Sequence, residues 1–156
     1  ELGRALYVFQ AIEVRLKLLL PHMSRPGEQA PPGGEGWSGR MKYLESKEML
    51  GPLVKLFQSR LSSTNPDEIE KEWREVVQSR NDVVHGFALQ PFAGCQSAED
   101  IARALQYIQT RRVRAIPMLQ MLDLLAHGFI AALQLPPSFE GEVTVELPEW
   151  WHPSAA

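Results

Sequence analysis

Apolar side chains recur at steps of three and four residues along the first twenty positions of the chain. This spacing places them on one face of an α-helix, and the pattern stops before Pro21. We therefore predict an amphipathic first helix with its apolar face toward a core. The apolar positions are Leu2, Leu6, Phe9, Ile12, Leu16 and Leu19 or Leu20.

The next stretch, residues 24–39, is rich in proline and glycine and poor in aliphatic side chains, which is typical of a loop. Helical spacing resumes from Met41 and is interrupted at Gly51-Pro52. Because proline is tolerated in the first turn of a helix, Pro52 is expected to open a new helix. The inward positions of that helix are Leu53, Leu56, Phe57 and Leu61.

A third helix has a well-marked start. Asn65 can cap it, Pro66 suits its first position, and the acidic side chains that follow complement the positive end of the helix dipole. The helix is predicted to run into Arg80. Its core-facing positions are Ile69, Trp73, Val76 and Val77.

The last long helix is predicted to begin after Ser97, because residues 97–100 have the sequence of a capping box. Its helical pattern continues to Leu133, where a proline pair follows shortly afterwards. Pro117 lies inside this pattern and is expected to kink the helix near its middle.

Residues 136–156 are interpreted as a short C-terminal extension. Within it, residues 142–146 alternate like a short strand, and Trp150 and Trp151 form an aromatic tail. The whole pattern predicts an all-α fold, a bundle of four or five helices in a single domain over residues 1–156.

The composition fits a globular protein with one core. Of the 156 residues, 44% are hydrophobic and 22% are charged, and the longest apolar runs fall far short of the ~20 residues that cross a bilayer. We therefore expect no membrane association. The single Cys95 cannot form an internal disulfide and no secretory leader is recognised, so a reducing cytoplasm is the expected compartment.

The net charge of −3 argues against a protein that coats nucleic acid, because such domains usually carry a strong positive excess. A catalytic cleft needs only a few local cations, so an RNA-cutting enzyme stays compatible with this charge.

One segment carries candidate chemistry. Arg80, Asn81 and His85 have the spacing Arg-Asn-x-x-x-His at the end of the third predicted helix. In a regular helix Asn81 and His85 share a face, whereas Arg80 lies about 140° round from His85. The long Arg80 side chain, a break in the helix or a second subunit would therefore have to complete a site that uses both residues.

These residue types can cleave a phosphodiester without a metal. An imidazole, with an ordinary pKa near ~6.5, can take a proton from an RNA 2′-hydroxyl or return one to the leaving oxygen. A guanidinium binds phosphate and stabilises the negative charge of the transition state, and an amide can orient either group. Such cleavage leaves a 2′,3′-cyclic phosphate and a 5′-hydroxyl. A structural interpretation stays open for His85 or Arg80 alone, because cations at the end of a helix are favoured by its dipole and its free carbonyls.

The motif at residues 80–85, followed by Gly86-Phe87 in a helical domain of this size, resembles the HEPN superfamily (higher eukaryotes and prokaryotes nucleotide-binding domains). That family is marked by an arginine, usually followed by a polar residue, and a histidine four to six residues further on. The first helix, at residues 9–13 and 16–19, is also similar to the opening helix of such domains.

The resemblance implies a metal-independent endoribonuclease with Arg80, Asn81 and His85 as catalytic residues. It also implies a homodimer in which two motifs form one RNA-cutting cleft, a role in defence, toxin–antitoxin or RNA-processing systems, and an antitoxin or regulatory partner. Members silenced by attached AMP often carry tyrosine two residues after the histidine, whereas this chain has Phe87. The alternative is a non-catalytic dimerisation or nucleotide-binding module of the same type.

Four further residues are weaker candidates. Glu13 lies on the apolar stripe of the first helix, where a carboxylate is costly unless paired, so it could orient Arg80 or His85, or reach solvent at the edge of the stripe. The last helix carries Arg111, Arg112 and Arg114, which could hold RNA phosphates or could form a solvated face with carboxylate neighbours.

No metal and no cofactor are expected. The remaining histidines do not repeat at metal-ligand spacing, and the glycines of the loop lack the ending and the preceding strand of a phosphate-binding loop.

Overall fold

The structure, a computed structural model, describes residues 1–23, 42–61, 63 and 65–133. These residues are all-helical and contain no strand, which confirms the predicted all-α class. The main helices are α1 (Leu2–Leu19), α3 (Leu50–Arg60), α4 (Pro66–Asn81) and α5 (Ala98–Leu133), and the short turns are η1 (Leu20–His22), η2 (Asp82–Gly86) and η3 (Phe87–Leu89). The predicted loop at 24–39, the strand-like segment at 142–146 and the tryptophan pair lie outside the described residues.

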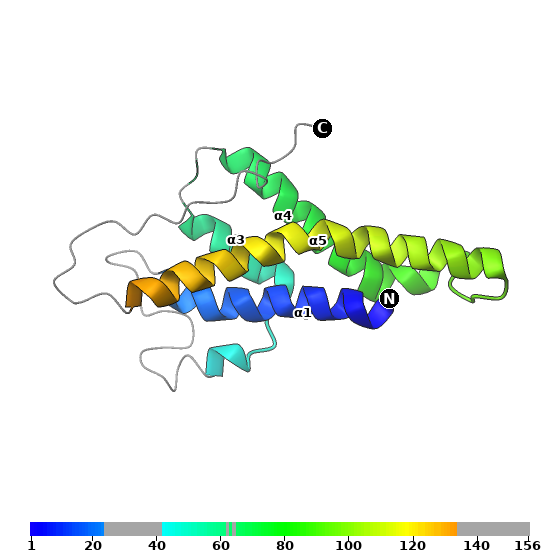
Figure 1. The fold of residues 1–156 in the computed structure, drawn as a ribbon, viewed down its shortest axis with the longest axis horizontal. Coiled ribbons are helices and arrows are strands. Elements are labelled where there is room, and N and C mark those ends of the chain that lie inside the picture. Colours follow the sequence, from blue (N-terminus) through cyan, green and yellow to red (C-terminus); the bar gives the residue numbers. More distant parts are fainter. Residues whose placement is uncertain (24–41, 62, 64, 134–156) are drawn as a thin grey trace.

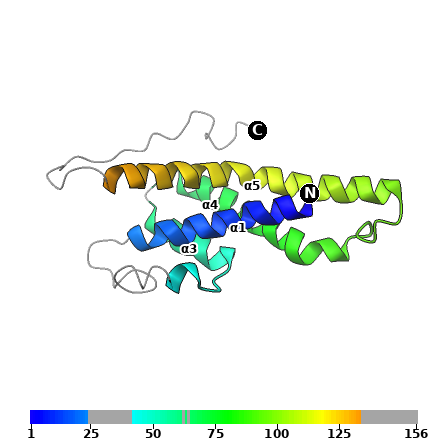
Figure 2. The same ribbon diagram turned by 60° about the horizontal axis from the view of Figure 1, so that its bottom comes forward.

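Helices α1 and α5 lie side by side and run in the same direction (Figures 1 and 2). Two ion pairs join them, one between Glu1 and Arg112 at 3.4 Å and one between Arg15 and Asp123 at 2.7 Å. Because the partners rise in the same order along both helices, these pairs also fix the parallel register. Helix α3 packs mainly on α1 and helix α4 mainly on α5, and α3 and α4 also contact each other.

The predicted starts of α3, α4 and α5 are confirmed, whereas the helical pattern that resumes from Met41 gives a single turn at 42–45, and residues 46–49 are not helical. Helix α3 holds Gly51-Pro52 in its first turn, and α4 begins at Pro66. At the start of α5 the Ser97 Oγ accepts a hydrogen bond from the Asp100 N–H at 3.0 Å, as a cap should. Asn65 occupies the cap position of α4, yet its side chain makes no capping bond. Its own N–H donates to the Ser63 Oγ at 3.0 Å instead.

Helix α5 continues through Pro117, so this proline does not end the helix. Its 36 residues correspond to about 54 Å, twice the length of the 18-residue α1. The kink expected at Pro117 stays a prediction.

The core is built from one face of each main helix. Trp73 of α4 meets Phe57 of α3 edge to face, with ring centroids 5.6 Å apart, and both side chains are fully buried. Leu2, predicted on the buried face, is 41% exposed because it stands at the first turn of α1. Other large buried side chains are Phe9, Ile12, Leu16, Leu20, Leu50, Leu53, Val76 and Leu122.

The N-terminal turns of α5 extend past the start of α1, as Figure 1 shows. There they pack on η2 and η3 through an aromatic cluster in which Tyr107 meets Phe92 at 5.6 Å and Phe87 at 6.2 Å between ring centroids. This overhang of α5 is therefore what supports the segment that carries the candidate motif.

By length and composition alone, α5 is also apolar enough to cross a membrane, with a mean hydropathy of 1.2 over an 18-residue window. Within the structure 22% of that window is buried. The core helix of a globular protein meets the same criterion, so the expectation of no membrane association stays a prediction.

Candidate functional site

A π-helical turn follows α4 and brings the motif together. Turn η2, from Asp82 to Gly86, is wider than an α-helical turn, because its hydrogen bonds join residues five apart instead of four apart. Arg80 and His85 are five residues apart, so the wider turn brings them toward the same face. The Arg80 Nη1 lies 3.2 Å from the His85 Nε2. From the sequence, the reach of the long Arg80 side chain, a break in the helix or a second subunit could pair these residues, and η2 is such a break in the regular helix.

The contact fixes the chemical roles of its two atoms. A guanidinium has donors and no acceptor, so the His85 Nε2 must accept the hydrogen bond. For this nitrogen to take a proton from a substrate hydroxyl, the Arg80 N–H must first leave its lone pair, for example by turning to a bound phosphate.

Asn81 and Glu13 complete the surroundings of Arg80. The Arg80 Nη1 donates to the Asn81 Oδ1 at 3.3 Å, and the Arg80 Nε lies 3.8 Å from the Glu13 Oε1. The Arg80 side chain is 16% exposed and the Glu13 side chain 21%, so this ion pair is partly shielded from water. The structure thus brings Glu13 to Arg80, across from α1 to the end of α4.

The two terminal nitrogens of Arg80 differ in their hydrogen bonds. Among the described residues, its Nη2 has no hydrogen-bond partner, while Nη1 contacts both His85 and Asn81. Guanidinium nitrogens of this kind are the donors through which arginine binds phosphate.

The three arginines of α5 are each paired with a carboxylate. Arg112 pairs with Glu1, Arg114 with Glu75, and Arg111 with Asp82, where the Arg111 Nε lies 2.9 Å from the Asp82 Oδ2. Within the described part of the chain, none of the three contacts Arg80, Asn81 or His85. Their neighbours are thus the carboxylates of a solvated face, and a free phosphate-binding cluster is not assembled here.

Two residues near the motif escaped the sequence analysis. Asp82 lies inside the motif and contacts Arg111, and Tyr107 donates its hydroxyl to the Asp82 carbonyl at 3.4 Å. Because Arg111 stands 29 residues beyond Asp82, no local spacing in the sequence could connect them.

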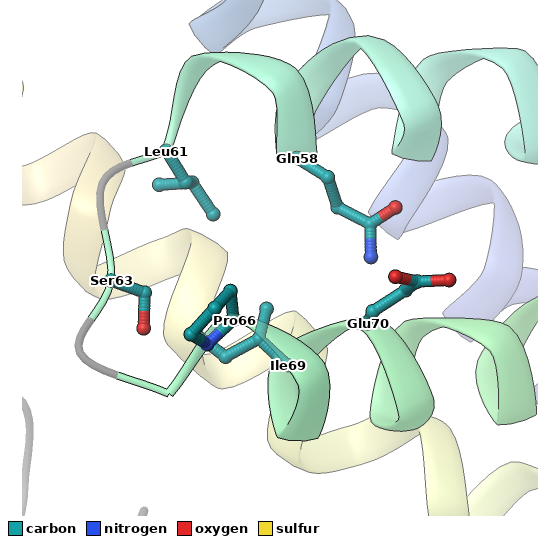
Figure 3. A pocket seen from close by; sticks show the side chains of 6 residues that line it. All are labelled: Gln58, Leu61, Ser63, Pro66, Ile69 and Glu70. Atoms are coloured by element: carbon teal, nitrogen blue, oxygen red, sulfur yellow. The ribbon is translucent and has the colours of Figure 1, made fainter.

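Two surface pockets lie on α4, and neither is lined by Arg80 or His85. One, of about 160 Å³, lies between the end of α3 and the start of α4, with the Gln58 amide and the Glu70 carboxylate facing each other at one end (Figure 3). This volume is small beside the ~300 Å³ of the smallest drug-sized sites, so we assign it no ligand. The lining residues of this pocket are Gln58, Leu61, Ser63, Pro66, Ile69 and Glu70.

The second pocket, of about 320 Å³, lies between α4 and the N-terminal half of α5. Its two arginines, Arg111 and Arg114, are the ones already paired with Asp82 and Glu75. The charges of the pocket therefore balance within it. Among the described residues, no group of three histidine, cysteine or acidic side chains is placed to hold a metal ion.

Comparison of the chain with protein-family models, with curated protein sequences and with solved structures finds no match.

Proposed function

We propose that this protein is a metal-independent endoribonuclease of the HEPN type, with His85 as the acid–base residue, Arg80 as the phosphate ligand and Asn81 as the group that positions them. One observation carries the proposal: the Arg80 Nη1 lies 3.2 Å from the Nε2 of an exposed His85, across a π-helical turn. π-Helical turns occur frequently at functional sites.

The cleavage step follows from this geometry. A substrate phosphate that binds Arg80 draws the guanidinium from the His85 Nε2, and this nitrogen then takes the proton of an RNA 2′-hydroxyl. The 2′-oxygen attacks the adjacent phosphorus, and the bond from phosphorus to the 5′-oxygen breaks. The Arg80 guanidinium stabilises the added negative charge on the phosphoryl oxygens. The products are a 2′,3′-cyclic phosphate and a 5′-hydroxyl. DNA has no 2′-hydroxyl and stays uncut.

A second subunit would supply the acid. In an in-line displacement the attacking and leaving oxygens lie on opposite sides of the phosphorus, so one imidazole cannot serve both at once. We propose that the partner subunit's His85 protonates the leaving oxygen in a shared cleft. Apolar side chains flank the site in support of this, because Val84 is 41% exposed and Leu89 is 83% exposed. A role in defence, toxin–antitoxin or RNA-processing systems, with an antitoxin or regulatory partner, belongs to the same proposal.

Phe87 sets one feature of such regulation. Its ring lies in the aromatic cluster against Tyr107 and Phe92, and it has no hydroxyl. AMP therefore has no oxygen to which it could be attached at this position, so the proposed enzyme is not silenced by that route.

The test compares two histidine variants on a mixed RNA pool in EDTA. His85→Ala should abolish cleavage, because no other group at the pair can take the 2′-proton. His127→Ala is the matched control, since His127 is also exposed but lies on α5 and contacts only its own helix, through the Asp123 carbonyl. Both variants should keep the helical content of the wild type. Equal cleavage by wild type and His85→Ala would refute the assignment.

The same experiment separates the enzyme from the binding module. If the protein is a nucleotide-binding module, the wild type should leave RNA intact and bind a labelled nucleotide, and Arg80→Ala should weaken that binding. Arg74→Ala is the matched control, because Arg74 is an exposed arginine on α4 paired only with Glu70. Cyclic-phosphate products that disappear in Arg80→Ala and persist in Arg74→Ala support the enzyme.

A further inference from the structure

Asp82, the first residue of η2, uses both carboxylate oxygens to join two helices. Its Oδ1 accepts a hydrogen bond from the Gln78 Nε2 at 2.7 Å, and its Oδ2 accepts one from the Arg111 Nε at 2.9 Å. The Asp82 side chain is 28% exposed and that of Arg111 23% exposed, so the ion pair is partly shielded from water. The start of the π-helical turn is thus tied to α4 and to α5 at once.

Arg111 is itself held in place by Tyr107. The Arg111 Cζ lies 3.4 Å from the centroid of the Tyr107 ring, and the Arg111 Nη1 donates to the Tyr107 carbonyl at 3.2 Å. The Tyr107 hydroxyl in turn donates to the Asp82 carbonyl at 3.4 Å. We call Asp82, Arg111 and Tyr107 the Asp82 clamp, because two residues one turn apart on α5 hold the side chain and the backbone of Asp82.

The clamp acts on the geometry of the Arg80–His85 pair. If residues 82–86 were α-helical, Arg80 and His85 would lie about 140° apart and their side chains would point away from each other. A π-helical turn persists where its surroundings hold it, since it is rarer than the α-helical alternative. The contacts of Asp82 with α5 are such surroundings, and they act at the residue where the wider turn begins.

We propose that Asp82, through Arg111 and Tyr107, is a positioning residue that keeps η2 π-helical and thereby holds the His85 imidazole against Arg80. The inference rests on the proposed ribonuclease function and extends it. It also gives Arg111 a different role from the phosphate binding that its charge suggested, because its guanidinium binds the Asp82 carboxylate and stacks on the ring of Tyr107.

The test uses Asp82→Ala with Glu75→Gln as a matched control. Glu75 pairs with Arg114 and so also joins α4 to α5, yet it contacts no residue of η2. In the RNA assay Asp82→Ala should lower kcat about tenfold to a hundredfold, as small misplacements of reacting groups do, with KM changed less than about twofold. Glu75→Gln should leave both constants near the wild-type values.

Two milder variants guard against loss of folding. Asp82→Asn keeps an oxygen acceptor for Arg111, so its kcat should fall between those of the wild type and Asp82→Ala. Arg111→Lys keeps the charge but loses the planar fork and the stacking on Tyr107, so it should behave like Asp82→Ala.

A second readout does not depend on catalysis. The ring-nitrogen chemical shifts of His85, assigned with His85→Ala, report the hydrogen bond from Arg80 to Nε2. They should move in Asp82→Ala, or in Arg111→Lys if the alanine variant does not fold, and stay in place in Glu75→Gln. Unchanged His85 shifts in Asp82→Ala or Arg111→Lys overturn the positioning role, even if RNA is cut. If the wild type has no nuclease activity but the His85 shifts move in Asp82→Ala or Arg111→Lys, the positioning role is upheld and the ribonuclease function is rejected.

Discussion

The guanidinium of Arg80 stands between groups of three chemistries: the Glu13 carboxylate, the Asn81 amide oxygen and the His85 imidazole. The carboxylate, at 3.8 Å, partly offsets the positive charge that a phosphate would meet. For the proposed RNA ligand, binding at this point should therefore depend more on the geometry of the hydrogen-bond donors of Arg80 than on the net charge of the protein, which is −3.

At the residue scale, the buried phenol of Tyr43 also makes the stability of the fold depend on pH. Burial, and then the charge of Glu48 and the hydrogen bond to it, raise the pKa of the Tyr43 phenol well above its usual range. The hydroxyl donates to the Glu48 Oε2 at 3.1 Å, and the residue is 4% exposed. The stabilising effect is complete below the ordinary phenol pKa of about 10 and is lost as the pH rises above it, since the unfolded chain then ionises and the fold does not.

Tyr43→Phe removes this ionisation. Urea denaturation between pH 9 and about 11 should show the free energy of unfolding falling less steeply in Tyr43→Phe than in the wild type, by up to about 1.4 kcal/mol per pH unit. Near pH 7 the variant should be less stable by about 1 kcal/mol, because the Glu48 carboxylate loses its donor. Identical alkaline slopes in the two proteins would count against the burial of this phenol.

At the scale of elements, the π-helical turn and the overhang of α5 depend on each other. Turn η2 takes the chain out of the α-helical path after α4, and η3 then places Phe87 against Tyr107 of α5. The overhang exists because α5 is twice as long as α1. Its first turns therefore have the motif segment as their neighbour where α1 is absent.

A single capping hydrogen bond contributes to the stability of the start of α5. Ser97→Ala removes the bond from the Asp100 N–H to the Ser97 Oγ and should lower the free energy of unfolding by about 1 kcal/mol. Ser97→Asp keeps a capping oxygen and adds a favourable charge at the positive end of the dipole, so it should match or exceed the wild type. The urea midpoint at constant m-value measures both effects, and equal losses in the two variants would contradict the cap.

At the scale of the molecule, a single chain holds one Arg80–His85 pair, and one imidazole cannot lie on both sides of the phosphorus as base and as acid. This is the reason that we propose a shared cleft. The proposal can be tested by mixing subunits, because a His85 defect in one chain disables the whole dimer only if the cleft needs both chains.

His85→Ala chains are denatured and refolded together with an equal amount of wild-type chains. About a quarter of the dimers then carry two intact His85 side chains, so a cleft that needs both should cut RNA at about a quarter of the wild-type rate, whereas a site within one chain should cut at about half of it. Light scattering on the wild type checks that the particle is a dimer. A monomeric wild type that cuts RNA, or a mixture that keeps about half of the wild-type rate, would limit the site to one chain.

Much of the fold could be predicted from local patterns. The periodicity of Phe9, Ile12 and Leu16 and the start signals at Pro66 and Ser97 act within a few residues, so their physical effects are visible in the sequence itself. The spacing of Arg80 and His85 likewise showed that a regular helix places them about 140° apart. The missing side-chain cap of Asn65 and the exposure of Leu2 were not predictable, because they depend on neighbours that the local pattern does not contain.

By itself, the sequence determined the helices, the all-α class and the residue types of the candidate site, since these follow from periodicity, capping and side-chain chemistry. Tertiary structure alone decided the parallel pairing of α1 with α5, the partner of Glu13 and the partner of Arg111. It also decided that the turn after α4 is π-helical, which is what brings Arg80 to His85. The physical reason is range: a helix forms from contacts three and four residues apart, whereas Asp82 meets Arg111 only after the chain has folded back over 29 residues.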